Sequence, residues 1–133
     1  MKLFSQLVVL AFMFATVACR DPIQTDQSVA VGSYSLESVS GRGPATGSMA
    51  LIPGGHAERR VRYRQPDGSL SSEYVAIGAF RVTEAQGVEL SLHENGGSSP
   101  YVWKLTAILD DGVLSLGYPD GADGWIVETY RRQ

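Results

Sequence analysis

The feature that most constrains the fold is a repeated pattern of short alternating segments separated by turn residues. From Gly32 onward, apolar and polar residues alternate over short stretches, and clusters rich in glycine, proline and aspartate separate these stretches. Side chains of a β-strand point to opposite faces in turn, so this alternation is typical of strands with one buried face. The same region lacks the wider apolar spacing of an amphipathic helix. The pattern therefore predicts an all-β domain.

Eight segments carry the alternation, at residues 32–40, 48–52, 56–64, 69–83, 88–93, 101–109, 113–118 and 125–131. The fourth segment is long, and Gly78 in its middle indicates either a bulge or bend, or a division into two strands. Short turns such as Asp110-Asp111-Gly112 favour pairing between sequence neighbours. We therefore expect an antiparallel meander of eight or nine strands, which can form a small barrel or a β-sandwich; eight strands close well into a barrel.

The N-terminal residues have the organisation of a secretory signal. Lys2 supplies a positive start, and the unbroken apolar run at 7–15 is shorter than the roughly 20 residues that a helix needs to cross the bilayer core. Small residues follow the run, as they do before a cleavage site. We therefore expect residues 1–18 to be a signal peptide.

The four residues Thr16-Val17-Ala18-Cys19 resemble the lipobox of bacterial lipoproteins, with Thr16 where that family usually has leucine. The resemblance implies that Cys19 receives a diacylglycerol, that the signal is cut before it, and that the new amine is acylated. Cys19 is the only cysteine, so the chain cannot form an internal disulfide. The alternative is ordinary cleavage after Ala18, which leaves a free thiol.

The expected order along the chain is a signal at 1–18, the lipidated Cys19 with a flexible tether through residue 31, and one all-β domain at 32–133. The tether region at 20–31 is polar and lacks periodic apolar residues. Arg20, rather than aspartate, follows Cys19. For a Gram-negative lipoprotein, the resemblance then implies a lipid-anchored place in the cell envelope, on the outer membrane and facing the periplasm.

A second resemblance concerns the two ends of the domain. Gly32-Ser33-Tyr34 resembles the first strand of small bacterial lipocalin-like domains, in which tryptophan is commoner than tyrosine at the third position. The closing residues Glu128-Thr129-Tyr130-Arg131-Arg132 fit the same pattern, because a late arginine there packs over the first-strand aromatic. The resemblance implies a small lipocalin-like barrel whose mouth admits an apolar ligand.

Composition and motifs argue against several functions. The chain has 11 Lys and Arg against 14 Asp and Glu, so it lacks the basic excess of a nucleic-acid binder. It contains no Gly-x-Ser-x-Gly elbow and no phosphate-binding glycine loop. His56 and His93 are its only histidines, too few for a usual zinc site. We predict a non-enzyme without catalytic residues, metal or cofactor.

Two sets of residues are candidates for binding. Arg60, Arg62 and Arg64, the arginine stripe, occupy alternate positions and should share one strand face, where guanidinium groups can bind an anion. The alternative is a solvated face with partners such as Glu73. The aromatic side chains of Tyr34, Trp103 and Trp125 can line a barrel mouth that admits a ligand, or can pack in the core.

Together these features predict a lipid-anchored envelope protein that acts as a non-enzymatic binding or structural module. Its expected partner is the membrane, which it contacts through its acyl chains. One alternative is a carrier of a small apolar ligand inside the barrel. The other is an inhibitor or stress protein that binds an exported protein through its loops.

Overall fold

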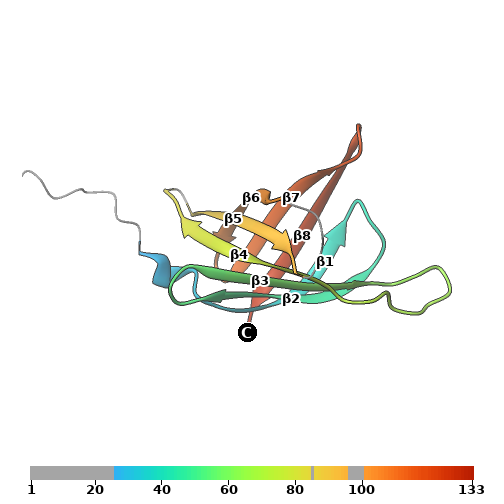
Figure 1. The fold of residues 1–133 in the computed structure, drawn as a ribbon, viewed down its shortest axis with the longest axis horizontal. Helices are drawn as coiled ribbons and strands as arrows, with labels where there is room; N and C mark the ends of the chain where they lie inside the picture. The colour runs from blue at the N-terminus through green and yellow to red at the C-terminus, as the bar shows by residue number, and fades with distance from the viewer. Residues whose placement is uncertain (1–25, 85, 96–100) are drawn as a thin grey trace, which may run out of the picture.

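The structure is a computed structural model, and it describes residues 26–84, 86–95 and 101–133. Eight antiparallel strands in chain order form a closed barrel, in which each strand pairs with the next and β8 pairs with β1 (Figure 1). The predicted all-β meander is confirmed, and it closes as a barrel rather than a sandwich. The strands are β1 (Gly32–Ser40), β2 (Ala45–Ile52), β3 (His56–Tyr63), β4 (Tyr74–Val82), β5 (Gly87–Glu94), β6 (Trp103–Asp110), β7 (Val113–Asp120) and β8 (Gly124–Arg132).

Two other expectations concern the N-terminal part of the chain. The predicted signal peptide and Cys19 lie outside the described residues. No helix in the described part of the chain is long and apolar enough to span a membrane.

The fourth segment forms one strand without the predicted bulge. Gly78 lies in continuous register with Ala57 on β3 and Leu92 on β5, and the strand begins only at Tyr74. A Cβ atom at Gly78 would lie 1.8 Å from the carbonyl oxygen of Ser91. The glycine is therefore required because the neighbouring backbone approaches closely, not because the strand carries an extra residue.

The irregularity lies instead in β1. Its pairing with β8 shifts register between Leu36 and Ser38. An extra residue at such a bulge reverses the side-chain alternation beyond it. Leu36 and Val39, which have opposite parity, are consequently both half-buried.

One end of the barrel is filled and covered. The 3₁₀ turn η1 (Gln27–Val29) lies at this end, and Ala30 after it is fully buried in the core. The Tyr34 hydroxyl donates to the Ala30 carbonyl oxygen at 2.7 Å, and the Arg132 guanidinium lies 5.3 Å from the centre of the Tyr34 ring. The expected late arginine over the first-strand aromatic is therefore Arg132. The described part of the predicted tether, 26–31, packs against the barrel.

The core fills the barrel interior. Its buried side chains come from the inward positions of most strands, and they are Ala30, Tyr34, Met49, Leu51, Ala57, Ala76, Phe80, Val82, Val88, Leu90, Leu92, Ala107, Leu114, Leu116 and Tyr130. In an antiparallel meander, successive turns lie at alternate ends. The connections β1–β2, β3–β4 and β7–β8 therefore lie at the end away from η1, as Figure 1 shows for the β3–β4 connection.

Candidate ligand cavity

The barrel wall opens between β6 and β7 at the end away from η1. These strands pair only from Ala107 with Leu116 to Asp110 with Val113, whereas β6 pairs with β5 from Trp103 onward and β7 pairs with β8 as far as Asp120. Residues 103–106 and 117–120 therefore face each other without ladder hydrogen bonds. Pro119 lies in this part of β7, and proline has no N–H to donate to a neighbouring strand.

A cavity of about 570 Å³ lies at this opening. Its volume is within the range of roughly 300–1,000 Å³ that is usual for small-molecule sites. Four of its nine lining residues are aromatic, and the rings of Tyr63 and Tyr74 meet edge to face with centroids 5.6 Å apart. The lining residues are Arg42, Arg59, Tyr63, Tyr74, Trp103, Lys104, Leu105, Tyr118 and Pro119.

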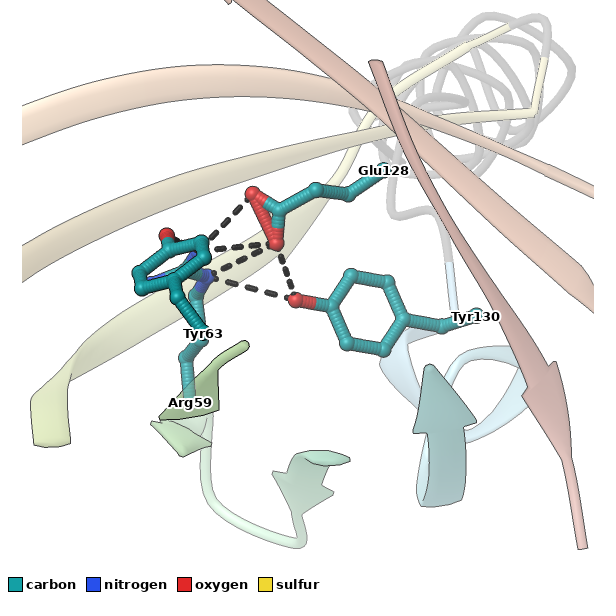
Figure 2. A network of polar contacts seen from close by, with 4 residues as sticks. All are labelled: Arg59, Tyr63, Glu128 and Tyr130. Carbon is teal, nitrogen blue, oxygen red and sulfur yellow. Dashed lines mark hydrogen bonds and ion pairs between the residues drawn. The ribbon is translucent and has the colours of Figure 1, made fainter. Parts of the chain in front are cut away.

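The lining residue Arg59 belongs to a buried ion pair, whose contacts Figure 2 shows. Arg59 on β3 and Glu128 on β8 are only 4% and 1% exposed. The Arg59 Nη2 atom lies 2.8 Å from each carboxylate oxygen of Glu128, and Nε donates to Oε1 at 3.1 Å. Charge-assisted contacts of this kind are stronger than neutral hydrogen bonds. The pair fixes β3 to β8 across the barrel interior, although the two strands are not neighbours in the sheet.

Tyrosine hydroxyls complete this network. The Tyr130 hydroxyl donates to Glu128 Oε1, and Arg59 Nε donates to the Tyr130 oxygen at 3.2 Å. Arg59 Nη2 also donates to the Tyr63 oxygen at 3.3 Å. Burial raises the pKa of Tyr130, and burial together with the nearby Glu128 carboxylate raises the pKa of Tyr118. Both hydroxyls therefore stay protonated at neutral pH.

Two further cations lie at the cavity. Arg42, in the β1–β2 connection, places its guanidinium 4.4 Å from the centre of the Tyr63 ring, which is a cation–π geometry. Lys104 lies on β6 at the unpaired edge. Neither forms an ion pair with a described residue, and none of the described residues that line the cavity is acidic. The cavity is therefore aromatic and electropositive.

The structure places the arginine stripe on the outer wall of the barrel. Arg60 and Arg62 are exposed and both approach Glu73, with Arg60 Nη1 at 2.7 Å and Arg62 Nε at 3.7 Å from its carboxylate. Arg60 also pairs with Glu58. Arg64 lies beyond the end of β3 and donates to the Gly68 carbonyl oxygen at 3.1 Å. The stripe thus brings Arg60 and Arg62 together around Glu73, while Arg64 holds a turn.

The three candidate aromatic residues do not converge. Trp103 lines the cavity and is 51% exposed. Tyr34 is buried at the filled end of the barrel. Trp125 points outward from β8 and is 60% exposed; a Cβ atom at Gly117 would lie 2.8 Å from its indole Nε1, so the ring lies over this glycine.

Arg59 and Glu128 were not singled out from the sequence, although a signal for them exists. Arg59 shares strand parity with Val61 and Tyr63, and Glu128 shares parity with Ile126 and Tyr130. Each charge therefore occupies a position whose neighbours of the same parity are apolar or aromatic. A charge of each sign at such inward positions predicts a buried pair, because an unpaired buried charge is too costly.

The function of this chain has to be argued from the geometry of the cavity, because the comparisons with family models and curated proteins gave no match. Among the described residues, no three His, Cys, Asp or Glu side chains gather as they would around a metal ion. No protein-family model matches the chain, and no curated protein matches it.

Proposed function

We propose that this chain is a lipid-anchored protein of the bacterial cell envelope whose barrel binds a small ligand with an apolar body, without catalysing a reaction. The observation that carries the binding role is the aromatic cavity of about 570 Å³ at the open end of the barrel. Buried apolar surface contributes roughly 25 cal/mol per Å², so such a lining can hold a ligand by burial alone. The lipobox-like leader at 16–19 supports the anchor.

The chemistry beneath the cavity favours binding over catalysis. A general base must reach the proton that it removes. Glu128 is fully buried, and its carboxylate accepts hydrogen bonds from Arg59 and Tyr130. The pKa values of the Tyr118 and Tyr130 hydroxyls are raised, so both groups stay protonated near neutral pH and cannot accept a proton as phenolates. Glu128 and Tyr130 are better suited to hold Arg59 in place than to transfer protons.

The placement of the cavity fits an anchored binder. The described chain enters the barrel at the η1 end, and the cavity lies at the opposite end with the β1–β2, β3–β4 and β7–β8 connections. An N-terminal lipid anchor would therefore leave the cavity directed away from the attachment point. A ligand could enter from the periplasm without contacting the bilayer.

The binding role can be tested with N-phenylnaphthylamine, a neutral fluorescent probe with an aromatic body. The protein for this test is the unacylated chain, residues 19–133 with Cys19→Ala, which needs no detergent. We expect saturable enhancement of probe fluorescence. Leu105→Trp should fill the cavity and weaken binding at least tenfold, whereas Ile108→Trp, an outward position on the same strand, should leave it unchanged.

Melting curves must first show that both tryptophan variants are folded. If Leu105→Trp does not fold, Tyr118→Trp replaces it as the variant that fills the cavity. Binding that does not saturate, or equal binding by the filled and control variants, would contradict a ligand site in the cavity.

A further inference from the structure

Beyond the presence of a cavity, the arrangement of its cations carries information about the ligand. Five of the described arginines, namely Arg59, Arg60, Arg62, Arg81 and Arg131, have a glutamate partner. Four described cations, namely Arg42, Arg64, Lys104 and Arg132, have no acidic partner among the described residues. Arg64 and Arg132 donate to backbone carbonyl oxygens elsewhere, whereas Arg42 and Lys104 line the cavity. The chain as a whole is net negative. Two of the four cations without an acidic partner thus lie at the cavity of a protein that is acidic overall, and no described lining residue is acidic.

Arg59 adds unused hydrogen-bond donors to these charges. A guanidinium group has five N–H donors, and Nη1 carries two of them. The hydrogen bonds of Arg59 to described residues use only Nε and Nη2. No buried side-chain nitrogen or oxygen of the described residues lacks a partner, so Nη1 must be accessible. Since Arg59 is 4% exposed and lines the cavity, the cavity is where this atom is reached.

The Glu128 carboxylate fixes the position of the Arg59 guanidinium, whose Nη1 donors are reached from the cavity. Bidentate pairing through Nη2 and Nε orients the guanidinium plane. It also neutralises the Arg59 charge, so the net positive charge at the cavity comes from Arg42 and Lys104. Donors held in position before a ligand arrives cost less ordering on binding. The cavity therefore combines aromatic lining residues with oriented N–H donors of Arg59 and the two cations Arg42 and Lys104.

Resting on the function proposed above, we propose that the ligand is an acid: an apolar or aromatic body that carries one anionic group, held by Arg59 Nη1 with Arg42 and Lys104. The aromatic rings of Tyr63, Tyr74 and Trp103 would contact the body. A neutral ligand would fill the same space but would leave these donors and charges unused. The N–H groups of Arg59 Nη1 can donate to the oxygen atoms of a carboxylate or a sulfonate, and such charge-assisted hydrogen bonds are stronger than neutral ones.

The test compares two probes of nearly the same shape. Anilinonaphthalene sulfonate is N-phenylnaphthylamine with an added sulfonate. With the unacylated chain at low salt, we expect the sulfonate to bind at least about tenfold more tightly, as one charge-assisted hydrogen bond permits. Added salt should reduce this preference, because exposed charges are screened. The affinity for the neutral probe should change little with salt.

Variants assign the preference to particular residues. The double variant Arg42→Gln/Lys104→Gln should lose most of the preference for the sulfonate while keeping its affinity for the neutral probe. Arg59→Lys keeps a positive charge near Glu128 but lacks Nη1, and it should also reduce the preference. Arg81→Gln, an exposed arginine on the outer face of β4, is the matched control and should retain it.

The outcomes separate this inference from the proposed function. If the neutral probe fails to bind, the binding role itself is wrong. If the neutral probe binds but the sulfonate binds no better, the acid ligand is wrong while the binding role stands. Equal preference in the wild type, the double variant and Arg59→Lys would likewise overturn the assignment, provided that melting curves show the variants to be folded.

Discussion

Replacing Arg59 with methionine should be among the most destabilising single changes in the barrel. Arg59→Met removes three charge-assisted hydrogen bonds to Glu128 and leaves that carboxylate with the Tyr118 and Tyr130 hydroxyls as donors but without a cation. Glu128 is fully buried, so the variant leaves a carboxylate in the barrel interior without its charged partner. Breaking a buried ion pair in this way costs about 3–5 kcal/mol. The total stability of such a domain is only about 5–15 kcal/mol.

The double variant Arg59→Met/Glu128→Leu separates the cost of an unpaired charge from the worth of the pair. Replacing both members of a buried ion pair with apolar residues is often neutral or stabilising. We therefore expect the double variant to be more stable than Arg59→Met. Glu128→Leu should therefore raise the free energy of unfolding in the Arg59→Met background and lower it when Arg59 is present.

Urea unfolding of the unacylated chain at pH 7, followed by circular dichroism, measures these free energies. For a domain of this size, a loss of 1 kcal/mol in the free energy of unfolding lowers Tm by about 4–8 °C, so thermal melting provides a second measurement of stability. If Arg59→Met does not fold, Arg59→Lys gives a smaller loss that remains measurable. The reasoning is refuted if Arg59→Met costs less than about 1 kcal/mol, or if the double variant loses the sum of the two single losses.

The remaining predictions concern Gly78 in the barrel wall, the buried Tyr130 hydroxyl, the arginine stripe and the lipid anchor at Cys19. Gly78→Ala should cost about 1–3 kcal/mol in urea unfolding, because its Cβ would overlap the Ser91 carbonyl oxygen and the backbone must shift; a neutral result would contradict this. Because burial raises the pKa of Tyr130 above 10.0, its contribution to stability is present below pH 10 and is lost as pH rises toward the raised pKa; Tyr130→Phe should flatten this alkaline loss in melting curves, and an unchanged slope would argue against it. Changing all three arginines of the stripe to glutamine should lower stability by less than about 1 kcal/mol, since its ion pairs are exposed. If the stripe binds an anion, the same variant should also lose a salt-sensitive interaction with envelope fractions; unchanged binding would leave only the solvated wall. Intact-mass measurement should show acyl chains on Cys19, and Cys19→Ala should abolish them; a bare wild-type mass would refute lipidation.

The strands could largely be predicted from the sequence because alternation reports one buried face. The expected segment at 88–93 falls inside β5, and both ends of β1 were predicted. The extra length expected before Tyr74 was wrong, because residues 69–73 form a connection in which only Leu70 makes an isolated bridge, to Arg64. Alternation does not distinguish such a connection from a strand.

The cavity was harder to predict than the strands. Its opening depends on where β6 stops pairing with β7, and that register belongs to tertiary structure. The outward position of Trp125 was equally hidden, since Val127 on the same face is also apolar and Ile126 faces inward. Arg59 and Glu128, by contrast, could have been found by comparing their strand parity with that of their neighbours.

The two tryptophans allow the binding claim to be tested within one molecule. Trp103 lines the cavity, whereas Trp125 lies on the outer wall over Gly117. Two-dimensional NMR of the nitrogen-labelled unacylated chain resolves one indole N–H signal from each. During titration with N-phenylnaphthylamine, a ligand cavity at the barrel mouth predicts that the Trp103 signal shifts and saturates while the Trp125 signal stays in place. Equal shifts at both indoles, or no shift at Trp103, would contradict that account.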